Sequence, residues 1–147
     1  MKSGNPSERF LGLKTTFFVM KIKELVAYLE SFAHPDLQES YDNAGLLTGS
    51  AEKELTGVLI TIDTTEEVIE EAAAKGLNLV VSHHPVIFSG LKRLTGSSYT
   101  ERAVMASIRR DIAVYASHTN LDAVREGVNG RICDKLKLQN CRILKPV

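Results

Sequence analysis

The stretch from residue 57 to residue 82 constrains the fold more than any other part of the chain. It opens with the β-branched run GVLITID at 57–63, whose composition and length are typical of a strand. Apolar residues then recur with helical spacing until Gly76, a residue that suits the end of a helix. The apolar run LNLVV at 77–81 predicts a second strand. Because a helix joins the two strands, the stretch predicts a parallel β-α-β unit.

The same alternation continues on both sides of this unit. Apolar residues at three- and four-residue steps predict a first helix that begins at Met20 and ends before Pro35. We also expect helices over 99–110 and 128–136, a strand over 112–116, and the start of another strand at 143–144. Together these patterns predict an α/β fold with a mixed, largely parallel sheet flanked by helices.

Charge and cysteine content exclude several classes of protein. The 147 residues include 18 Lys and Arg against 18 Asp and Glu, so the formal net charge is zero. This balance argues against binding to nucleic acid, and no apolar run approaches the roughly 20 residues that a membrane span needs. The two cysteines, Cys133 and Cys141, form neither a disulfide framework nor a CxxC pair. We therefore expect reduced thiols in a cytoplasmic protein without nucleic-acid or membrane partners.

The first 19 residues differ in character from the rest of the chain. They lack both the long apolar stretch and the small-residue cleavage site of a secretory signal. Three basic residues against one acidic residue leave a mitochondrial presequence as an alternative. We interpret residues 1–19 as a leader or as the product of a start codon assigned too early, and we expect the fold to begin at Met20.

Histidines follow two of the predicted strands at the point where each strand ends. His83 and His84 come directly after the strand at 77–81, and His118 follows the strand at 112–116, with Asp122 four residues later. Ligands of open α/β sheets bind outside the carboxyl ends of the strands. Imidazole and carboxylate together suit zinc, iron or manganese, and such mixed sets are common in hydrolytic sites with two metals. The sequence therefore predicts metal binding at this edge.

Local backbone geometry refines this prediction. Pro85 favours an extended backbone at His84, and adjacent side chains of an extended backbone point to different sides. The neighbouring imidazoles therefore suit two different ions better than one shared ion. If residues 118–122 form a helical turn, the side chains of His118 and Asp122 leave the same face and converge. The remaining histidine, His34, lies in a polar loop, and we do not count it as a ligand.

Several nearby residues have two possible roles. Asp63 ends a predicted strand, and it either accepts a hydrogen bond from an imidazole or caps the next helix. Asp42 and Asn43 either line the pocket or form a turn. Nucleophilic catalysis has less support, because the chain has no G-x-S-x-G motif, and it has no phosphate-binding glycine motif either.

At these residues the sequence strongly resembles the NIF-three-like dinuclear metal-centre proteins, often named type 2 homologues of GTP cyclohydrolase I. The pairing of SHHP with SHTNLD is a specific signal, and the resemblance extends over 20–147. The matching stretches are YDNAGL at 41–46 with Gly49, LITIDTTEEVIEEAAAKGLNLVVSHHPVIF at 59–88, and IAVYASHTNLDAVREGVN at 112–129.

The resemblance implies both a site and a function. It implies that His83, His84, His118 and Asp122 hold two divalent metal ions, either zinc, iron, manganese or cobalt. It also implies a metal-dependent hydrolase acting on a small molecule, for which a nucleotide or another phosphorylated compound is a reasonable guess, in a homo-oligomer that is a ring-shaped hexamer in the full-length family. The alternative is a metal-binding protein without catalysis, which hands metal on or binds a partner.

Two departures from the family pattern matter. Tyr41 stands where the family usually has Trp. The family also draws a histidine and a glutamate from a C-terminal motif, whereas this chain has no histidine after His118 and only Glu126 as a later glutamate. We therefore expect 20–147 to be an N-terminal metal-binding lobe whose C-terminal lobe is missing, with partial or single-metal occupancy.

Overall fold

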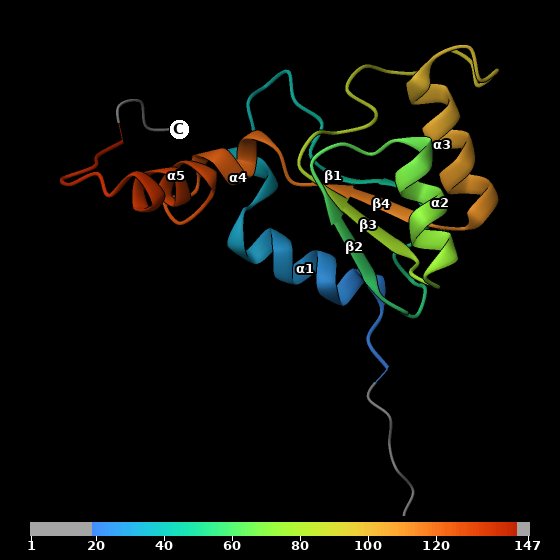
Figure 1. Ribbon diagram of the computed structural model, residues 1–147, viewed down its shortest axis with the longest axis horizontal. Helices are drawn as coiled ribbons and strands as arrows, with labels where there is room; N and C mark the ends of the chain where they lie inside the picture. Colours follow the sequence, from blue (N-terminus) through green and yellow to red (C-terminus); the bar gives the residue numbers. More distant parts are fainter. Residues whose placement is uncertain (1–18, 144–147) are drawn as a thin grey trace, which may run out of the picture.

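The computed structural model describes residues 19–143 (Figure 1). The predicted leader, except for its last residue, and the second residue of the strand expected at 143–144 lie outside this range. In chain order the elements are α1 (Ile22–Phe32), the 3₁₀ helix η1 (Pro35–Leu37), β1 (Gly45–Thr48), β2 (Val58–Thr61), α2 (Glu66–Ala74), β3 (Leu79–Ser82), α3 (Tyr99–Arg110), β4 (Ala113–Ala116), α4 (Thr119–Ala123) and α5 (Val128–Leu136).

The strands form one mixed sheet in the order β1-β4-β3-β2. Strand β3 pairs in parallel with both β2 and β4, whereas β1 pairs antiparallel with β4. The predicted α/β class with a largely parallel sheet is therefore confirmed, as is the β-α-β unit formed by β2, α2 and β3. Strand β1 was not predicted. It is short, and its register shifts between Leu46 and Thr48, so its sequence carries little strand periodicity.

Helices cover both faces of the sheet. Side chains alternate between the two faces along each strand, so a residue's position in the strand decides which helix it contacts. Figure 1 shows α1 on one face and α2 with α3 on the other. Leu79 and Tyr115 share a buried cluster with Ile22 of α1, whereas Val80 and Val114 belong to the cluster that contains side chains of α2 and α3. Neighbours along β3 and β4 thus point to opposite faces, and both faces are apolar because both are covered.

The C-terminal part of the described chain is less deeply packed. Helix α4 includes most of the helical turn predicted at 118–122, and α5 has the bounds predicted for it. No residue of α5 is buried, and Figure 1 shows it beyond α4, away from the sheet. Between residues 19 and 143, none of the helices has the length and apolar character that crossing a bilayer would require.

Candidate metal centre

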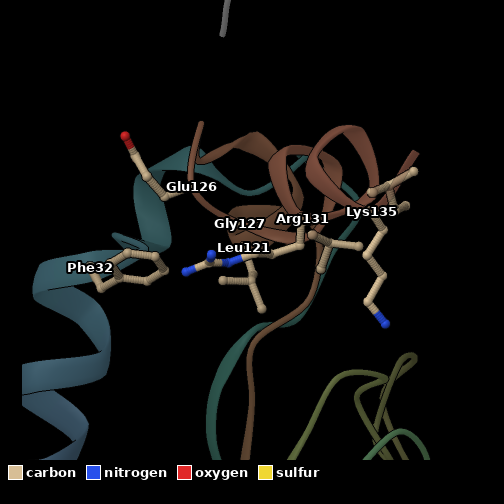
Figure 2. Close-up of a pocket in the computed structure, with 8 residues that line it drawn as sticks. Phe32, Leu121, Glu126, Gly127, Arg131 and Lys135 are labelled. Carbon is tan, nitrogen blue, oxygen red and sulfur yellow. The ribbon is translucent and has the colours of Figure 1, made fainter. Parts of the chain in front are cut away.

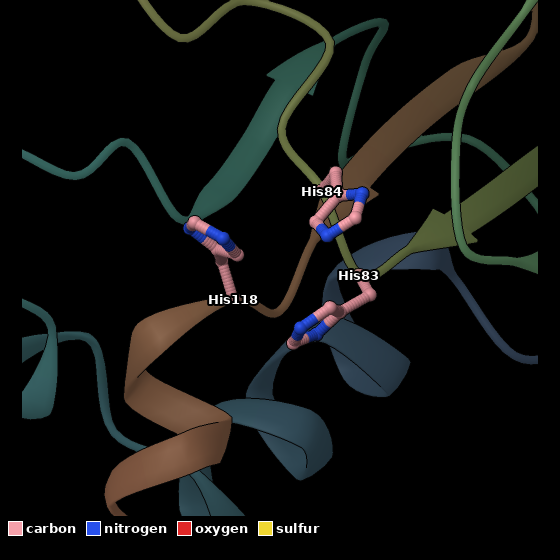
Figure 3. A group of neighbouring side chains, drawn as sticks. All are labelled: His83, His84 and His118. Carbon is pink, nitrogen blue, oxygen red and sulfur yellow. The ribbon is translucent and has the colours of Figure 1, made fainter. Parts of the chain in front are cut away.

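Three histidine side chains converge at the carboxyl edge of the sheet. His83, His84 and His118 each offer a ring nitrogen, and these nitrogens lie within 4.8 Å of one another. The ring centroids are 5.0 Å apart for His83 and His84, 5.2 Å for His83 and His118, and 5.6 Å for His84 and His118. Figure 3 shows the three rings turned toward a common space. We call this group the histidine cluster.

The register of the sheet brings these residues together. Ser82 and Ala116 are partners at the ends of β3 and β4, so the residues that follow them begin at the same edge. Beyond the strands, the pairing continues for one more residue, because the Ser117 N–H donates to the Ser82 carbonyl over 2.9 Å. The Ser82 hydroxyl donates to the His84 carbonyl over 2.9 Å and fixes the backbone between the two histidines. Long-range strand pairing therefore creates the cluster.

Each imidazole has a fixed partner on Nδ1. The partners are the carbonyl oxygen of Ser117 for His83 at 2.9 Å, the carboxylate of Asp63 for His84 at 2.8 Å, and the carboxylate of Asp42 for His118 at 2.8 Å. Such oxygens only accept hydrogen bonds, so each Nδ1 carries the proton in the neutral ring. Each Nε2 is then left as a lone-pair donor, which is how second-layer partners prepare histidines for metal binding.

Asp42 accepts more hydrogen bonds than the other two partners. Its side chain is completely buried, and it accepts hydrogen bonds from His118 Nδ1, the Thr119 N–H at 3.0 Å, the Thr119 hydroxyl and the Asn43 N–H at 2.7 Å. Burial by itself would raise the pKa of Asp42, but the hydrogen bonds from Thr119, His118 and Asn43 outweigh it and lower the pKa. The Asp42 carboxylate thus holds the His118 ring, and the site and turn roles left open for Asp42 coincide.

Two further residues position the site, and one of them settles an alternative that the sequence left open. Asp63 bonds to the His84 ring, and Thr65 caps α2 by accepting from the Val68 N–H at 3.4 Å, so Asp63 is an imidazole partner and not the helix cap. Asn120, to which the sequence assigned no role in the site, is a further residue that positions the site. It is fully buried, accepts from the His118 N–H at 2.9 Å and donates to the Ala33 carbonyl at 2.8 Å, which ties the start of α4 to the end of α1.

Asp122 lies close to the cluster but outside it. Its Oδ1 is 3.9 Å from His83 Nε2, and its side chain is 36% exposed. The Asp122 N–H donates to the His118 carbonyl at 3.2 Å, which is the helical turn that the spacing predicts. His34 is 62% exposed, bonds to Asp36 and lies outside the histidine cluster.

The donor set of three imidazoles fits a divalent cation. The rings of His83 and His84 are inclined at 45° and both reach the space in front of His118, whereas extended backbone alone predicts that they point to different sides. Neutral imidazole is a common ligand of zinc, iron, manganese and cobalt, so the cluster does not select among them.

A separate hollow of about 450 Å³ lies between the end of α1 and α5 (Figure 2). Its lining contains none of the three clustered histidines. The residues around it are Phe32, Leu121, Glu126, Gly127, Val128, Arg131, Ile132 and Lys135. This hollow therefore belongs to the peripheral C-terminal segment and not to the metal centre.

Comparison with known proteins agrees with the motifs. A family model described as Duf34/NIF3 (NGG1p interacting factor 3) matches residues 20–147. A GTP cyclohydrolase 1 type 2 homolog from Clostridium perfringens is 37% identical over 117 residues, which are 80% of this chain and 45% of that relative. A protein of the same name from Staphylococcus aureus strain Mu50 is 41% identical over 125 residues, or 85% of this chain and 34% of that one. The chain thus spans less than half the length of these relatives.

Solved structures share the fold over the same part of the chain. A Bacillus cereus protein related to NIF3 superposes with a TM-score of 0.82 at 36% identity, covering 88% of this chain and 36% of the other. The Staphylococcus aureus protein SA1388 gives a TM-score of 0.81 at 40% identity, covering 87% and 36%. The architecture described above is therefore that of NIF3-related proteins.

Proposed function

The chain belongs to the Duf34/NIF3 family, and on that premise we propose that it binds divalent metal ions at the histidine cluster and serves as a metal-dependent hydrolase. One observation carries the proposal: three imidazole nitrogens meet within 4.8 Å, and every Nδ1 is already bonded to an oxygen acceptor. An imidazole whose Nδ1 donates to an oxygen keeps the Nε2 lone pair free for a metal ion, which supports the proposal.

The protein residues have separable roles in this proposal. His83, His84 and His118 hold the ion through Nε2, and Asp42 and Asp63 orient two of the rings. Asp122, near His83, is the carboxylate available to a second ion, which would make the centre dinuclear. A bound divalent ion supplies Lewis-acid chemistry, by lowering the pKa of water and polarising a phosphoryl or carbonyl group.

The proposed reaction class rests on the names of the curated relatives. The curated relatives carry the name GTP cyclohydrolase 1 type 2 homolog, which is consistent with hydrolysis of a small molecule. We also propose that this chain is part of a homo-oligomer, which would be a hexamer in the full-length protein. A cytoplasmic location is also proposed, and the free thiols of Cys133 and Cys141 support it.

A metal-binding role without catalysis is the second candidate, and one observation favours it. The two carboxylates that bond directly to the cluster, Asp42 and Asp63, are both engaged by imidazoles. Within residues 19–143, Asp122 is then the nearest carboxylate that can move a proton, and it is 3.9 Å from His83 Nε2. If Asp122 binds an ion, the described residues leave no carboxylate beside the cluster to act as an acid or base, and such a site stores or transfers the ion without catalysis.

Metal analysis combined with an activity screen tests the two candidates. We expect purified wild-type protein, and the His34→Ala control, to retain zinc or manganese after desalting, and the double variant His83→Ala/His84→Ala to lose it. The loaded wild type should then hydrolyse at least one nucleotide, phosphate ester or cyclic amide. Retained metal without turnover would favour the non-catalytic role, and unchanged metal content in the double variant would refute the site.

A further inference from the structure

Two large aromatic rings stand exposed beside the histidine cluster. Tyr41 is 64% exposed and Phe88 is 49% exposed. Their ring centroids are 6.3 Å apart, and the Phe88 centroid is also 6.3 Å from that of His118, with the two ring planes at 85°. The aromatic pair is therefore continuous with the candidate metal centre, through an edge-to-face contact.

The backbone that carries both rings is held firmly. Tyr41 precedes Asp42, whose carboxylate is bonded to the start of α4. The Asn43 side chain donates to the Ile87 carbonyl at 2.6 Å, so it joins the segment of Tyr41 to the segment of Phe88. Val86, two residues before Phe88, is buried in the core. The rings are thus presented to solvent on fixed supports, an arrangement that lowers the ordering cost of binding a ligand.

The geometry of the pair determines how it can be used. The rings are inclined at 51°, and their 6.3 Å separation is too short to admit a third ring between them, since two stacking distances of about 3.5 Å are needed. A ligand ring must instead lie against their open faces. Because the two ring planes are inclined, a planar ring that stacks on one of them meets the other with its edge, and a group attached to it extends toward His118 and the histidine cluster.

We propose that Tyr41 and Phe88 form a stacking shelf for a planar heteroaromatic ring, such as a nucleobase, carried by the small molecule whose reacting group meets the metal centre. The proposal deepens the proposed function and rests on it for the position of the reacting group. The shelf selects the ring and the cluster acts on the substituent, so the two parts recognise different portions of one ligand.

Nuclear magnetic resonance titration with guanosine and adenosine tests the shelf, with ribose 5-phosphate as the counterpart without a ring. We expect both nucleosides to bind and to shift the resonances of residues near Tyr41 and Phe88, and ribose 5-phosphate to bind at least about tenfold more weakly. Tyr41→Ala and Phe88→Ala should each weaken nucleoside binding by about tenfold, the order of one lost stacking contact. Tyr41→Phe and Phe88→Tyr should restore it.

Tyr28→Ala is the matched control, because Tyr28 is 69% exposed on α1 and should leave binding unchanged. Repeating the titration in protein treated with EDTA measures nucleoside binding without metal, and metal uptake is measured separately. A protein that binds nucleosides but takes up no metal would refute only the metal function. A protein that takes up metal but binds no nucleoside would refute only the shelf. Equal binding of ribose 5-phosphate and the nucleosides would also refute the shelf. So would dissociation of an oligomer in Tyr41→Ala or Phe88→Ala, because the rings would then cover a protein interface.

Discussion

The two halves of the candidate site rest on very different supports. The three histidines follow β3 and β4, and all four residues of β4 are buried. Asp122 instead lies on α4, a helix of five residues, and the next helix, α5, has no buried residue. The core of the sheet therefore fixes the imidazoles, whereas a peripheral segment places the carboxylate. In the proposed dinuclear centre, the ion on the three imidazoles would therefore be held more firmly than the ion on Asp122.

Matched leucine substitutions test this contrast most severely. Leu79 in β3 is fully buried, whereas Leu136 at the end of α5 is 64% exposed. We expect Leu79→Ala to lower the free energy of unfolding by about 2–5 kcal/mol, because it removes buried methyl groups and leaves a cavity. Leu136→Ala should change it by about 0.5 kcal/mol or less. Urea unfolding of both variants checks the prediction, and equal losses would contradict it.

Removing the partner of His118 tests whether the sheet edge depends on its buried carboxylate. We expect Asp42→Asn to weaken zinc binding by about 10–100-fold, the usual effect of losing such a partner. The amide keeps the shape of Asp42 but loses the charge and one acceptor. Calorimetric titration with zinc measures the change. Asp36→Asn is the control, since Asp36 is 90% exposed, and a loss of the same size there would show that the effect is not specific to the site.

The loop that follows His84 is expected to be sensitive to acid, because the carboxylate of Glu101 anchors its far end. Helix α5, by contrast, has no buried residue to anchor it. The Glu101 carboxylate accepts hydrogen bonds from the N–H and hydroxyl groups of Thr95 and Ser97. These bonds, with that from the Thr95 N–H the largest contributor, lower the pKa of Glu101 from 4.5 to about 2. A pKa lower in the folded state means that the stabilisation is complete above about pH 4.5 and is lost toward pH 2.

Thermal melts across this range measure the effect. We expect Glu101→Gln to melt at a lower temperature than wild type at pH 7, and the difference to vanish near pH 2. The exposed Glu126 provides the control variant Glu126→Gln, for which little difference is expected at any pH. A difference for Glu101→Gln that stayed constant between pH 7 and pH 2 would show that the carboxylate charge is not responsible.

We expect the smallest effect from a buried hydroxyl group in the well-packed sheet. Tyr115 in β4 is fully buried, its hydroxyl has no hydrogen-bond partner among the described residues, and burial raises its pKa to about 12. Because an unpaired buried polar group is unfavourable, we expect Tyr115→Phe to leave the free energy of unfolding unchanged or to raise it by about 1 kcal/mol. A clear loss in urea unfolding would reveal a partner for this hydroxyl.

The sequence predicted local patterns better than long-range contacts. The hydrophobic periodicity of residues 57–82 was sufficient to predict β2, α2 and β3. The positions of the strand ends were sufficient to place the histidines at one edge of the sheet. The bond between Asp42 and His118 joins residues 76 positions apart, and no local spacing reports it. The inward turn of both His83 and His84 was likewise missed, because it depends on how the chain leaves β3 and not on alternation within a strand. The sequence alone predicts neither the exposure of Tyr41 and Phe88 nor their proximity, because both depend on the fold.

X-ray absorption spectroscopy of protein loaded with one zinc ion per chain tests the three-imidazole site, because it counts the ligands around that ion. We predict three imidazole nitrogens at about 2.0–2.1 Å, in wild type and in Asp122→Asn alike. Two or fewer imidazoles in wild type would contradict this claim. So would sulfur at about 2.3 Å, which would place the ion on Cys133 and Cys141 in the peripheral segment instead of on the sheet edge.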